Sequence, residues 1–385
     1  MTTIVIAPDS FKESADAFSV AQAIAQGWQE CRPDDIVLLH PMADGGEGSM
    51  QVITGMLGGQ VEQLEVQNPL GAPCLAHWGW LPETSTAVIE MASASGLQLI
   101  SADQRDVLRA STYGTGELIK AALDKGAKVI VLTLGGSATN DSGAGMLQAL
   151  GVQFLDKNQQ PLPLGGAALA ELAQINLQNL DPRVAQTQFT VACDVTNPLC
   201  GPLGASAIFG PQKGATPAQV AELDKALGHF ADVCANILKM DYREKPGAGA
   251  AGGTGFAAMA FLKAAFRPGF DLIADLTQLE DKIKDATVVI TGEGRMDAQT
   301  LHGKVPFGVG HLAKKHRVPA IALVGALDDG YQELYAHGIT CAFSAASGPM
   351  ELENSKAWIK KLLQHRAHDI SRLYSATLAL APSVK

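Results

Sequence analysis

The sequence has few aromatic residues, few charges and few cysteines for its length of 385 residues. Aromatic side chains make up 5% and charged side chains 18%, whereas hydrophobic residues make up 47%, enough for packed interiors. The six cysteines form no C-x-x-C pair and match no zinc spacing, which argues against a structural zinc site. Free thiols in the reducing cytoplasm are therefore expected. The cysteines are Cys31, Cys74, Cys193, Cys200, Cys234 and Cys341.

No hydrophobic run reaches the roughly 18 residues that a membrane-spanning helix needs. The chain opens on a short strand-like run at 3–7, without a basic segment or a long apolar segment before it, so we expect no signal peptide. The net charge of −10 argues against non-specific nucleic-acid binding, which depends on basic patches. We therefore expect neither a membrane nor a nucleic acid as partner.

Several well-known catalytic motifs are also missing. The chain has no G-x-x-x-x-G-K-[ST] loop, no G-x-S-x-G elbow, no H-E-x-x-H and no protein-kinase signature set. A G-x-G-x-x-G occurs at 247–252, but a dinucleotide site requires a strand directly before it, and residues 241–246 are polar and turn-like. A glycine-rich start to a helix over 256–266 is favoured instead, and its N–H groups can bind an anion.

Strands and helices alternate at both ends of the chain but not in the middle. Strand-like runs at 61–66, 73–80 and 87–91 follow one another as in antiparallel hairpins. The pattern predicts a parallel-sheet α/β domain built from 1–60 plus 286–385, with a mixed-sheet α/β domain, 61–285, inserted into it. A cleft between two domains is the default place for a ligand.

A glycine-rich stretch at 133–146 follows a strand-like apolar run at 129–134 and precedes a helix-like run. Glycines let the backbone approach a ligand closely, and a helix start offers free N–H groups to a phosphate. A tight capped turn is the alternative explanation. The residues of this stretch alone leave both explanations open, and a phosphate site here would use Gly135, Gly136, Ser137 and Asn140.

Acidic residues stand at the ends of several predicted strands, where ligands bind in open α/β sheets. Carboxylates at such positions can hold Mg²⁺ together with substrate phosphates, or accept a proton from a hydroxyl. Each one alone is better explained as a turn former or helix cap. Lys12 and Arg295 are the best nearby cations, and Lys213 and Lys304 are weaker candidates. The acidic residues are Asp9, Asp44, Glu47, Asp194, Glu293 and Asp297.

Six stretches together resemble the signatures of bacterial type I glycerate kinases, in order along nearly the whole chain. The departures are small: Glu13 and Ser142 stand where many members have glycine. The resemblance implies two α/β domains, one of them flavodoxin-like and split between the chain ends. It also implies ATP-dependent phosphorylation of D-glycerate with Mg²⁺, in organic-acid catabolism. The stretches are Ala7–Lys12, Ala43–Gly48, Gly135–Asp141, Cys193–Leu199, Phe209–Gly214 and Thr291–Arg295.

The resulting site hypothesis assigns each candidate a role. The catalytic residues are Lys12, Asp194 and Arg295; substrate is bound by Asp9, Ser10, Asp44 and Asn197; phosphate or nucleotide is bound by Gly135, Gly136, Ser137, Asn140, Gly252 and Gly253; and Mg²⁺ is held by Asp44, Glu293 and Asp297.

The expected product is 2-phosphoglycerate, which the family resemblance implies. The residues themselves do not distinguish it from 3-phosphoglycerate. A nicotinamide-dependent oxidoreductase of hydroxy acids and a non-catalytic sugar-acid sensor are the weaker alternatives. The sequence leaves a homo-oligomer open.

Overall fold

The computed structural model describes residues 2–380, and Met1 and residues 381–385 of the predicted terminal domain lie outside them. The chain forms two compact units. Unit 1 comprises Met1–Asp44 and Gly269–Lys385, and unit 2 comprises Gly45–Pro268. The boundaries expected from the sequence were at 60 and 285. Those of the compact units, after Asp44 and after Pro268, lie about 16 residues earlier. The reason is packing, because α2 contacts β4 and β5 of unit 2, and α9 and α10 contact α11 of unit 1.

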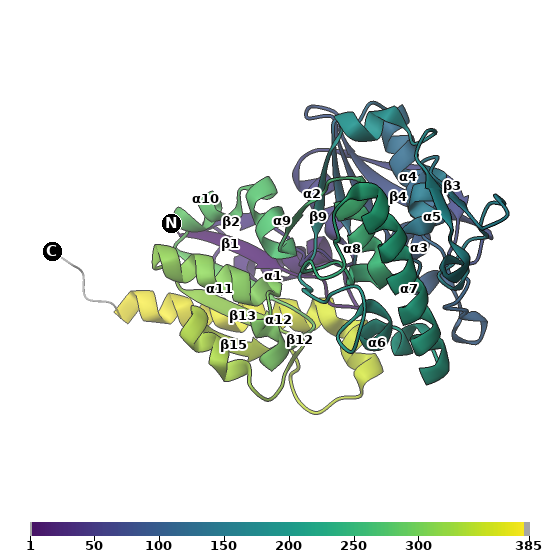
Figure 1. The fold of residues 1–385 in the computed structure, drawn as a ribbon. Coiled ribbons are helices and arrows are strands. Elements are labelled where there is room, and N and C mark those ends of the chain that lie inside the picture. The colour runs from purple at the N-terminus through teal and green to yellow at the C-terminus, as the bar shows by residue number, and fades with distance from the viewer. Residues whose placement is uncertain (1, 381–385) are drawn as a thin grey trace. The chain divides into compact units, whose positions relative to one another are not determined.

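Unit 1 is built on a five-stranded sheet in the order β15-β13-β11-β1-β2. All four pairings are parallel, and in chain order within the unit this is the flavodoxin-like arrangement 2-1-3-4-5. Figure 1 shows purple β1 and β2, from the start of the chain, and green β13, which belongs to the same sheet. The expected split parallel-sheet fold is confirmed.

Hydrophobic alternation explains how unit 1 buries this sheet. Ile4 and Ile6 of β1 pack in a cluster with α1 and α12, whereas the intervening Val5, equally buried, faces the other side, on which α11 packs. The strands are β1 (Thr3–Pro8), β2 (Ile36–Leu39), β11 (Val288–Gly292), β13 (Ala320–Val324) and β15 (Ile339–Ser344), with a small pair β12 (Arg295–Met296) and β14 (Ala326–Leu327). The helices are α1 (Ala17–Cys31), α9 (Gly269–Thr277), α10 (Leu279–Lys284), α11 (Val305–His316) and α12 (Leu352–Leu380), with 3₁₀ turns at Ala298–Leu301 and Tyr331–His337.

Unit 2 is built on a six-stranded mixed sheet in the order β10-β9-β6-β5-β4-β3. Strands β5, β6, β9 and β10 are parallel, and β3 and β4 join by antiparallel pairing, as the hairpin pattern predicted. The strands are β3 (Gln60–Gln67), β4 (Pro73–Leu81), β5 (Thr86–Glu90), β6 (Val129–Thr133), β9 (Gln188–Ala192) and β10 (Ala265–Arg267), with a separate pair β7 (Gln153–Leu155) and β8 (Gln174–Asn176).

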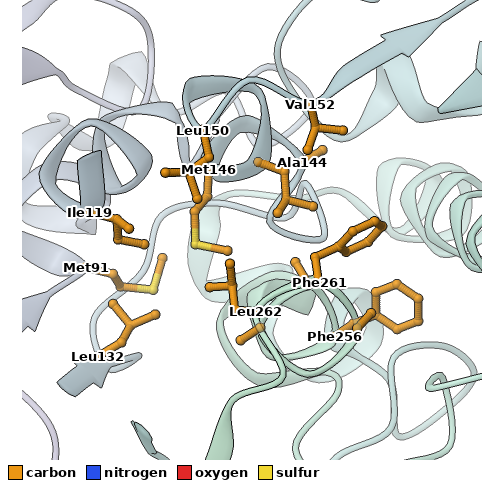
Figure 2. Packing of buried hydrophobic residues seen from close by; sticks show 14 of the residues in the cluster. Met91, Ile119, Leu132, Ala144, Met146, Leu150, Val152, Phe256, Phe261 and Leu262 are labelled. Carbon is orange, nitrogen blue, oxygen red and sulfur yellow. The ribbon is translucent and has the colours of Figure 1, made fainter. Parts of the chain in front are cut away.

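The helices of unit 2 surround a continuous hydrophobic core. Figure 2 shows Met146 of α5 close to Leu262, which follows α8, with Leu150, Met91 and Leu132 around them. The helices are α2 (Ser49–Met56), α3 (Ala92–Ser95), α4 (Tyr113–Asp124), α5 (Ala144–Ala149), α6 (Ala205–Phe209), α7 (Pro217–Leu238) and α8 (Ala250–Phe261), with 3₁₀ turns at Leu97–Leu99, Ala102–Gln104, Ala167–Glu171, Pro182–Gln186 and Pro211–Lys213.

The helix predicted over 256–266 is partly wrong. Helix α8 ends at Phe261, and Ala265–Arg267 forms strand β10 beside β9. Three residues at the start of α8, Ala251 to Gly253, are not helical and have φ of 52°, 66° and 88°. Glycine is suited to two of these positions because it carries no steric penalty at positive φ.

Candidate active site

Three carboxylates meet at the carboxyl edge of the unit 1 sheet. Asp9 follows β1, Asp44 follows β2 by a short loop, and Glu293 follows β11. Burial raises the pKa of Asp9 well above its usual range, and the charges of Asp44 and Glu293 raise it further. The backbone N–H of Ser10, which donates to Asp9 Oδ1 at 2.6 Å, lowers the pKa and so opposes this rise. The structure therefore brings together Asp9, Ser10, Asp44 and Glu293, as expected for strand ends of one parallel sheet.

The carboxylate of Glu293 is held by contacts to two other side chains. Its Oε1 accepts a hydrogen bond from Thr300 Oγ1 at 2.6 Å, and its Oε2 lies 3.1 Å from Lys304 Nζ. Burial raises the pKa of Glu293, and the Thr300 and Lys304 contacts oppose that rise. The preceding Gly292 has no room for a side chain, because an added Cβ would overlap the carbonyl oxygen of Leu323 on β13.

Lys304 contacts Glu293 of this acidic cluster, although we expected Lys12 and Arg295 to be the better candidate cations. The Arg295 side chain is 66% exposed and forms ion pairs with Asp328 and, at 3.7 Å, with Asp297. Lys12 is exposed in the loop after β1, with its backbone nitrogen close to Gly294. A lysine one residue before a helix start is a signal that sequence reasoning could have weighted more heavily.

Glu293 and Asp44 suit Mg²⁺ better than Asp297 does. Residues 2–380 contain no group of three His, Cys, Asp or Glu side chains placed to hold a metal on their own. In phosphoryl-transfer sites, however, Mg²⁺ takes one or two carboxylates and completes its shell with water and phosphate. A divalent cation would offset the mutual repulsion among the carboxylates of Asp9, Asp44 and Glu293, which contributes to the raised pKa of Asp9. Asp297 instead caps a 3₁₀ turn, where its Oδ1 accepts from Gln299 N at 2.8 Å.

Unit 2 carries two glycine loops that approach each other closely. The exposed Gly135 and Gly136 follow β6, and a Cβ added at Gly135 would lie 3.0 Å from Gly46 Cα. Gly136 has φ of 75°, and its carbonyl oxygen accepts a hydrogen bond from Leu97 N at 2.9 Å. The next residue, Ser137, forms an isolated antiparallel β-bridge with Gly96. Two loops with little side-chain bulk thus expose their backbone at one place, which suits a phosphate.

The second half of the β6 loop is buried. Asn140 Nδ2 donates to Ser206 Oγ at 2.7 Å, whereas the Oγ1 of Thr139, the Oδ1 of Asn140 and the Oγ of Ser142 lack hydrogen-bond partners. The carboxylate of Asp141 accepts from Thr112 N at 2.8 Å and from the N–H groups of two residues of its own loop. Asp141 therefore has a structural role in this loop.

Gly252 and Gly253 are buried against the β6 loop. A Cβ added at Gly252 would overlap the Thr139 carbonyl oxygen, and one at Gly253 would lie 2.8 Å from Ser142 Cα. Gly252 O also accepts from Ser142 N at 2.9 Å. Close packing therefore explains why glycine occupies both positions. Nucleotide binding by Gly252 and Gly253 stays a prediction. Residues 239–249 contain no strand, so the dinucleotide fingerprint lacks its required context.

Asp194 and Asn197 lie in the loop after β9. The Asp194 side chain is exposed at the strand end. Asn197 Nδ2 donates to the Leu203 carbonyl at 2.9 Å, and its own carbonyl accepts from Gly249 N at 2.9 Å, so this residue braces the loop. Asp194 is therefore placed where a ligand can reach it, and Asn197 has a role in shaping its surroundings.

Glu90 is a buried acid that the sequence analysis missed. It ends β5, and its carboxylate accepts from Gly48 N at 2.8 Å and Met50 N at 3.3 Å, at the start of α2. Burial raises the pKa of Glu90 to about 7, and the charge of Glu47 adds to the rise, against the lowering by the backbone N–H groups. Glu90 is the last residue of a strand, and this position could have marked it as a candidate in the sequence.

A model of the glycerate kinase family matches residues 4–375. The glycerate kinase of Halalkalibacterium halodurans is 48% identical over 96% of this chain and 98% of its own length. The glycerate 2-kinase of Escherichia coli K12 is 49% identical over 89% of this chain and 90% of its own. A crystal structure from Salmonella typhimurium LT2, assigned provisionally as glycerate kinase 2, is 44% identical with a TM-score of 0.89, covering 98% of this chain and 99% of that one.

These matches define the class of protein first: a kinase, transferring a phosphoryl group to an alcohol. The chain belongs to the glycerate kinase family. Within the described residues, no helix is both long and apolar enough to cross a membrane.

Proposed function

We propose that this protein transfers the γ-phosphoryl group of ATP to the 2-hydroxyl of D-glycerate, giving 2-phosphoglycerate and ADP. The observation that carries the proposal is the cluster of Asp9, Asp44, Glu293 and Lys304 at the carboxyl edge of a flavodoxin-like sheet. Similarity to a relative named glycerate 2-kinase supports the choice of the 2-hydroxyl over the 3-hydroxyl.

In the proposed reaction, the glycerate hydroxyl oxygen forms a bond to the γ-phosphorus while the bond to the ADP oxygen breaks. The hydroxyl proton passes to a carboxylate, for which we propose Asp194, exposed at the end of β9. Lys12 and Arg295 neutralise the carboxylate of glycerate or the transferred group. Asp9, Ser10 and Asn197 orient the substrate.

Asp44 and Glu293 are the proposed Mg²⁺ ligands, with Asp297 as a third candidate. Bound Mg²⁺ neutralises charge on the phosphates during transfer. Lys304, which lies 3.1 Å from Glu293, supplies a second positive charge at the same place. Backbone N–H groups of the β6 loop, from Gly135 to Asn140, hold phosphate oxygens.

The proposed location is the cytoplasm, where ATP is available. All six cysteines lie within the described residues and are free thiols, which agrees with a reducing compartment. The proposed small-molecule partners are therefore ATP and D-glycerate.

The test is a steady-state measurement of ADP release with ATP, Mg²⁺ and D-glycerate, alongside L-glycerate and reactions without acceptor or metal. We expect release that requires both D-glycerate and Mg²⁺. Release that is equal without acceptor, or no release with folded protein, would overturn the proposal. Binding of a nicotinamide cofactor in place of ATP would favour the oxidoreductase alternative.

A further inference from the structure

Lys213 is a lysine buried inside unit 2 with no part in the mechanism proposed above. It ends the 3₁₀ turn Pro211–Lys213, and its side chain is only 2% exposed. Burial lowers its pKa to about 7, and the charge of Asp141 opposes that shift. Burying an ammonium group is unfavourable unless the group is paired. If this side chain only filled space, an apolar side chain of the same length would be more favourable here.

The Lys213 ammonium holds one specific backbone atom. Its Nζ donates a hydrogen bond of 2.6 Å to the carbonyl oxygen of Thr139. Gly252 makes room for the same oxygen, because a Cβ at that position would overlap it. The Thr139 carbonyl is thus fixed by two residues that are distant from it in sequence.

The segment that Lys213 holds is not arranged to satisfy its own polar groups. Thr139 Oγ1, Asn140 Oδ1 and Ser142 Oγ are all buried without a hydrogen-bond partner. A buried polar group without a partner destabilises the folded state. Ser142 also has φ of 53°, which is strained for a residue with a side chain. Unpaired groups and backbone strain of this kind gather at functional segments.

We propose that Lys213 is a positioning residue for the phosphate-binding loop, Gly135 to Asn140. By fixing the Thr139 carbonyl, it sets the direction of the loop backbone, including the N–H groups that precede Thr139. This inference rests on the proposed function, in which that loop binds the phosphates of ATP. Lys213 itself lies beneath the loop and does not contact the nucleotide.

The test compares Lys213→Met with Lys225→Met, since Lys225 is an exposed lysine on α7 of the same unit. We measure ATP affinity by calorimetry with a non-hydrolysable analogue, and KM and kcat for each substrate. We expect at least a tenfold loss of analogue affinity and a matching rise in KM for ATP in Lys213→Met. KM for D-glycerate should change less than twofold, and Lys225→Met should behave as the native protein.

A purely structural lysine would give a different pattern. Lys213→Ala should regain ATP affinity when propylammonium is added, because that ion can restore the donor, whereas tetramethylammonium, which has no N–H, should not. Gly252→Ala, which displaces the same carbonyl, should also raise KM for ATP selectively. Native analogue affinity in folded Lys213→Met would overturn the positioning role, as would failure of Lys213→Met and Lys213→Ala to fold. Failure of the native protein to bind the analogue would instead count against the proposed function.

Discussion

The Nζ atom of Lys304 lies 3.1 Å from Oε2 of Glu293, the buried carboxylate that follows β11. Lys304 is the residue just before α11, so its position depends on where that helix begins, and Glu293 depends on where β11 ends. A helix and a strand of unit 1 thus bring a cation and an anion together at the sheet edge where Asp9 and Asp44 also lie. A phosphoryl group with its metal needs both charges.

Replacing Lys304 with methionine should reduce kcat/KM for ATP by about 10²-fold, because one positive charge that faces the phosphates is lost. Lys284→Met removes an exposed lysine of α10 and should leave kcat/KM unchanged. Steady-state ADP release from both variants checks this. A change of less than twofold in Lys304→Met would exclude Lys304 from the site.

Asp194→Asn should lower kcat by about 10²-fold or more if Asp194 accepts the hydroxyl proton, since general bases contribute on that order. Asp9→Asn serves as the comparison, because Asp9 is another candidate carboxylate that follows a strand end. Single-turnover phosphate transfer separates chemistry from binding. Near-native transfer by folded Asp194→Asn would shift the assignment away from Asp194.

Ser142→Gly should stabilise the protein. The backbone at Ser142 has φ of 53°, and its hydroxyl is buried without a partner. Glycine removes about 1 kcal/mol of strain and about 1–3 kcal/mol of unmet hydrogen bonding, against about 0.5–1 kcal/mol of added chain entropy. Ser85→Gly is the matched control, since Ser85 has φ of 50° and is not fully buried. Urea unfolding should show a larger gain for Ser142→Gly, and an equal or smaller gain would contradict this account of the loop.

Glu90 should make stability depend on pH. Its pKa is about 7 in the folded protein against a usual 4.5, so the folded state binds the proton more tightly. The stability contributed by the protonated carboxyl is fully present below pH 4.5 and is lost as pH rises through 7, by about 3 kcal/mol at most. Glu90→Gln cannot ionise. The native protein should therefore lose about 2 kcal/mol relative to Glu90→Gln between pH 5 and pH 8 in denaturant unfolding, and parallel pH profiles would refute this.

The alternation of hydrophobic residues was sufficient to predict the split parallel sheet and the hairpins of the inserted unit. It failed at β10, because three residues, Ala265–Arg267, are too short to show a period and Phe266 continued the helix pattern. The compact unit begins at Gly45 and not near residue 60, since α2 follows β2 in sequence but packs on β4 and β5. That choice depends on tertiary contacts.

The positions of candidate residues were predictable where they stand at strand ends. Asp9, Asp44 and Glu293 were predicted in this way, and the structure brings them together, while their roles stay predictions. The contacts of Lys304 and Lys213 were not predictable because their partners, Glu293 and the Thr139 carbonyl, are distant in sequence. Glu13 and Ser142, noted as departures from glycine, both have positive φ, of 61° and 53°, so the backbone keeps the conformation that glycine would favour.

Phosphorus NMR of the products formed from ATP, Mg²⁺ and D-glycerate tests most directly whether the 2-hydroxyl is phosphorylated. Phosphate on the 2-hydroxyl couples to the single proton on C2 and gives a doublet, whereas phosphate on the 3-hydroxyl couples to the two protons on C3 and gives a triplet. We expect ADP and a phosphomonoester doublet in equal amounts. A triplet would contradict the 2-hydroxyl assignment, and unconsumed ATP in the presence of folded protein would contradict the kinase activity itself.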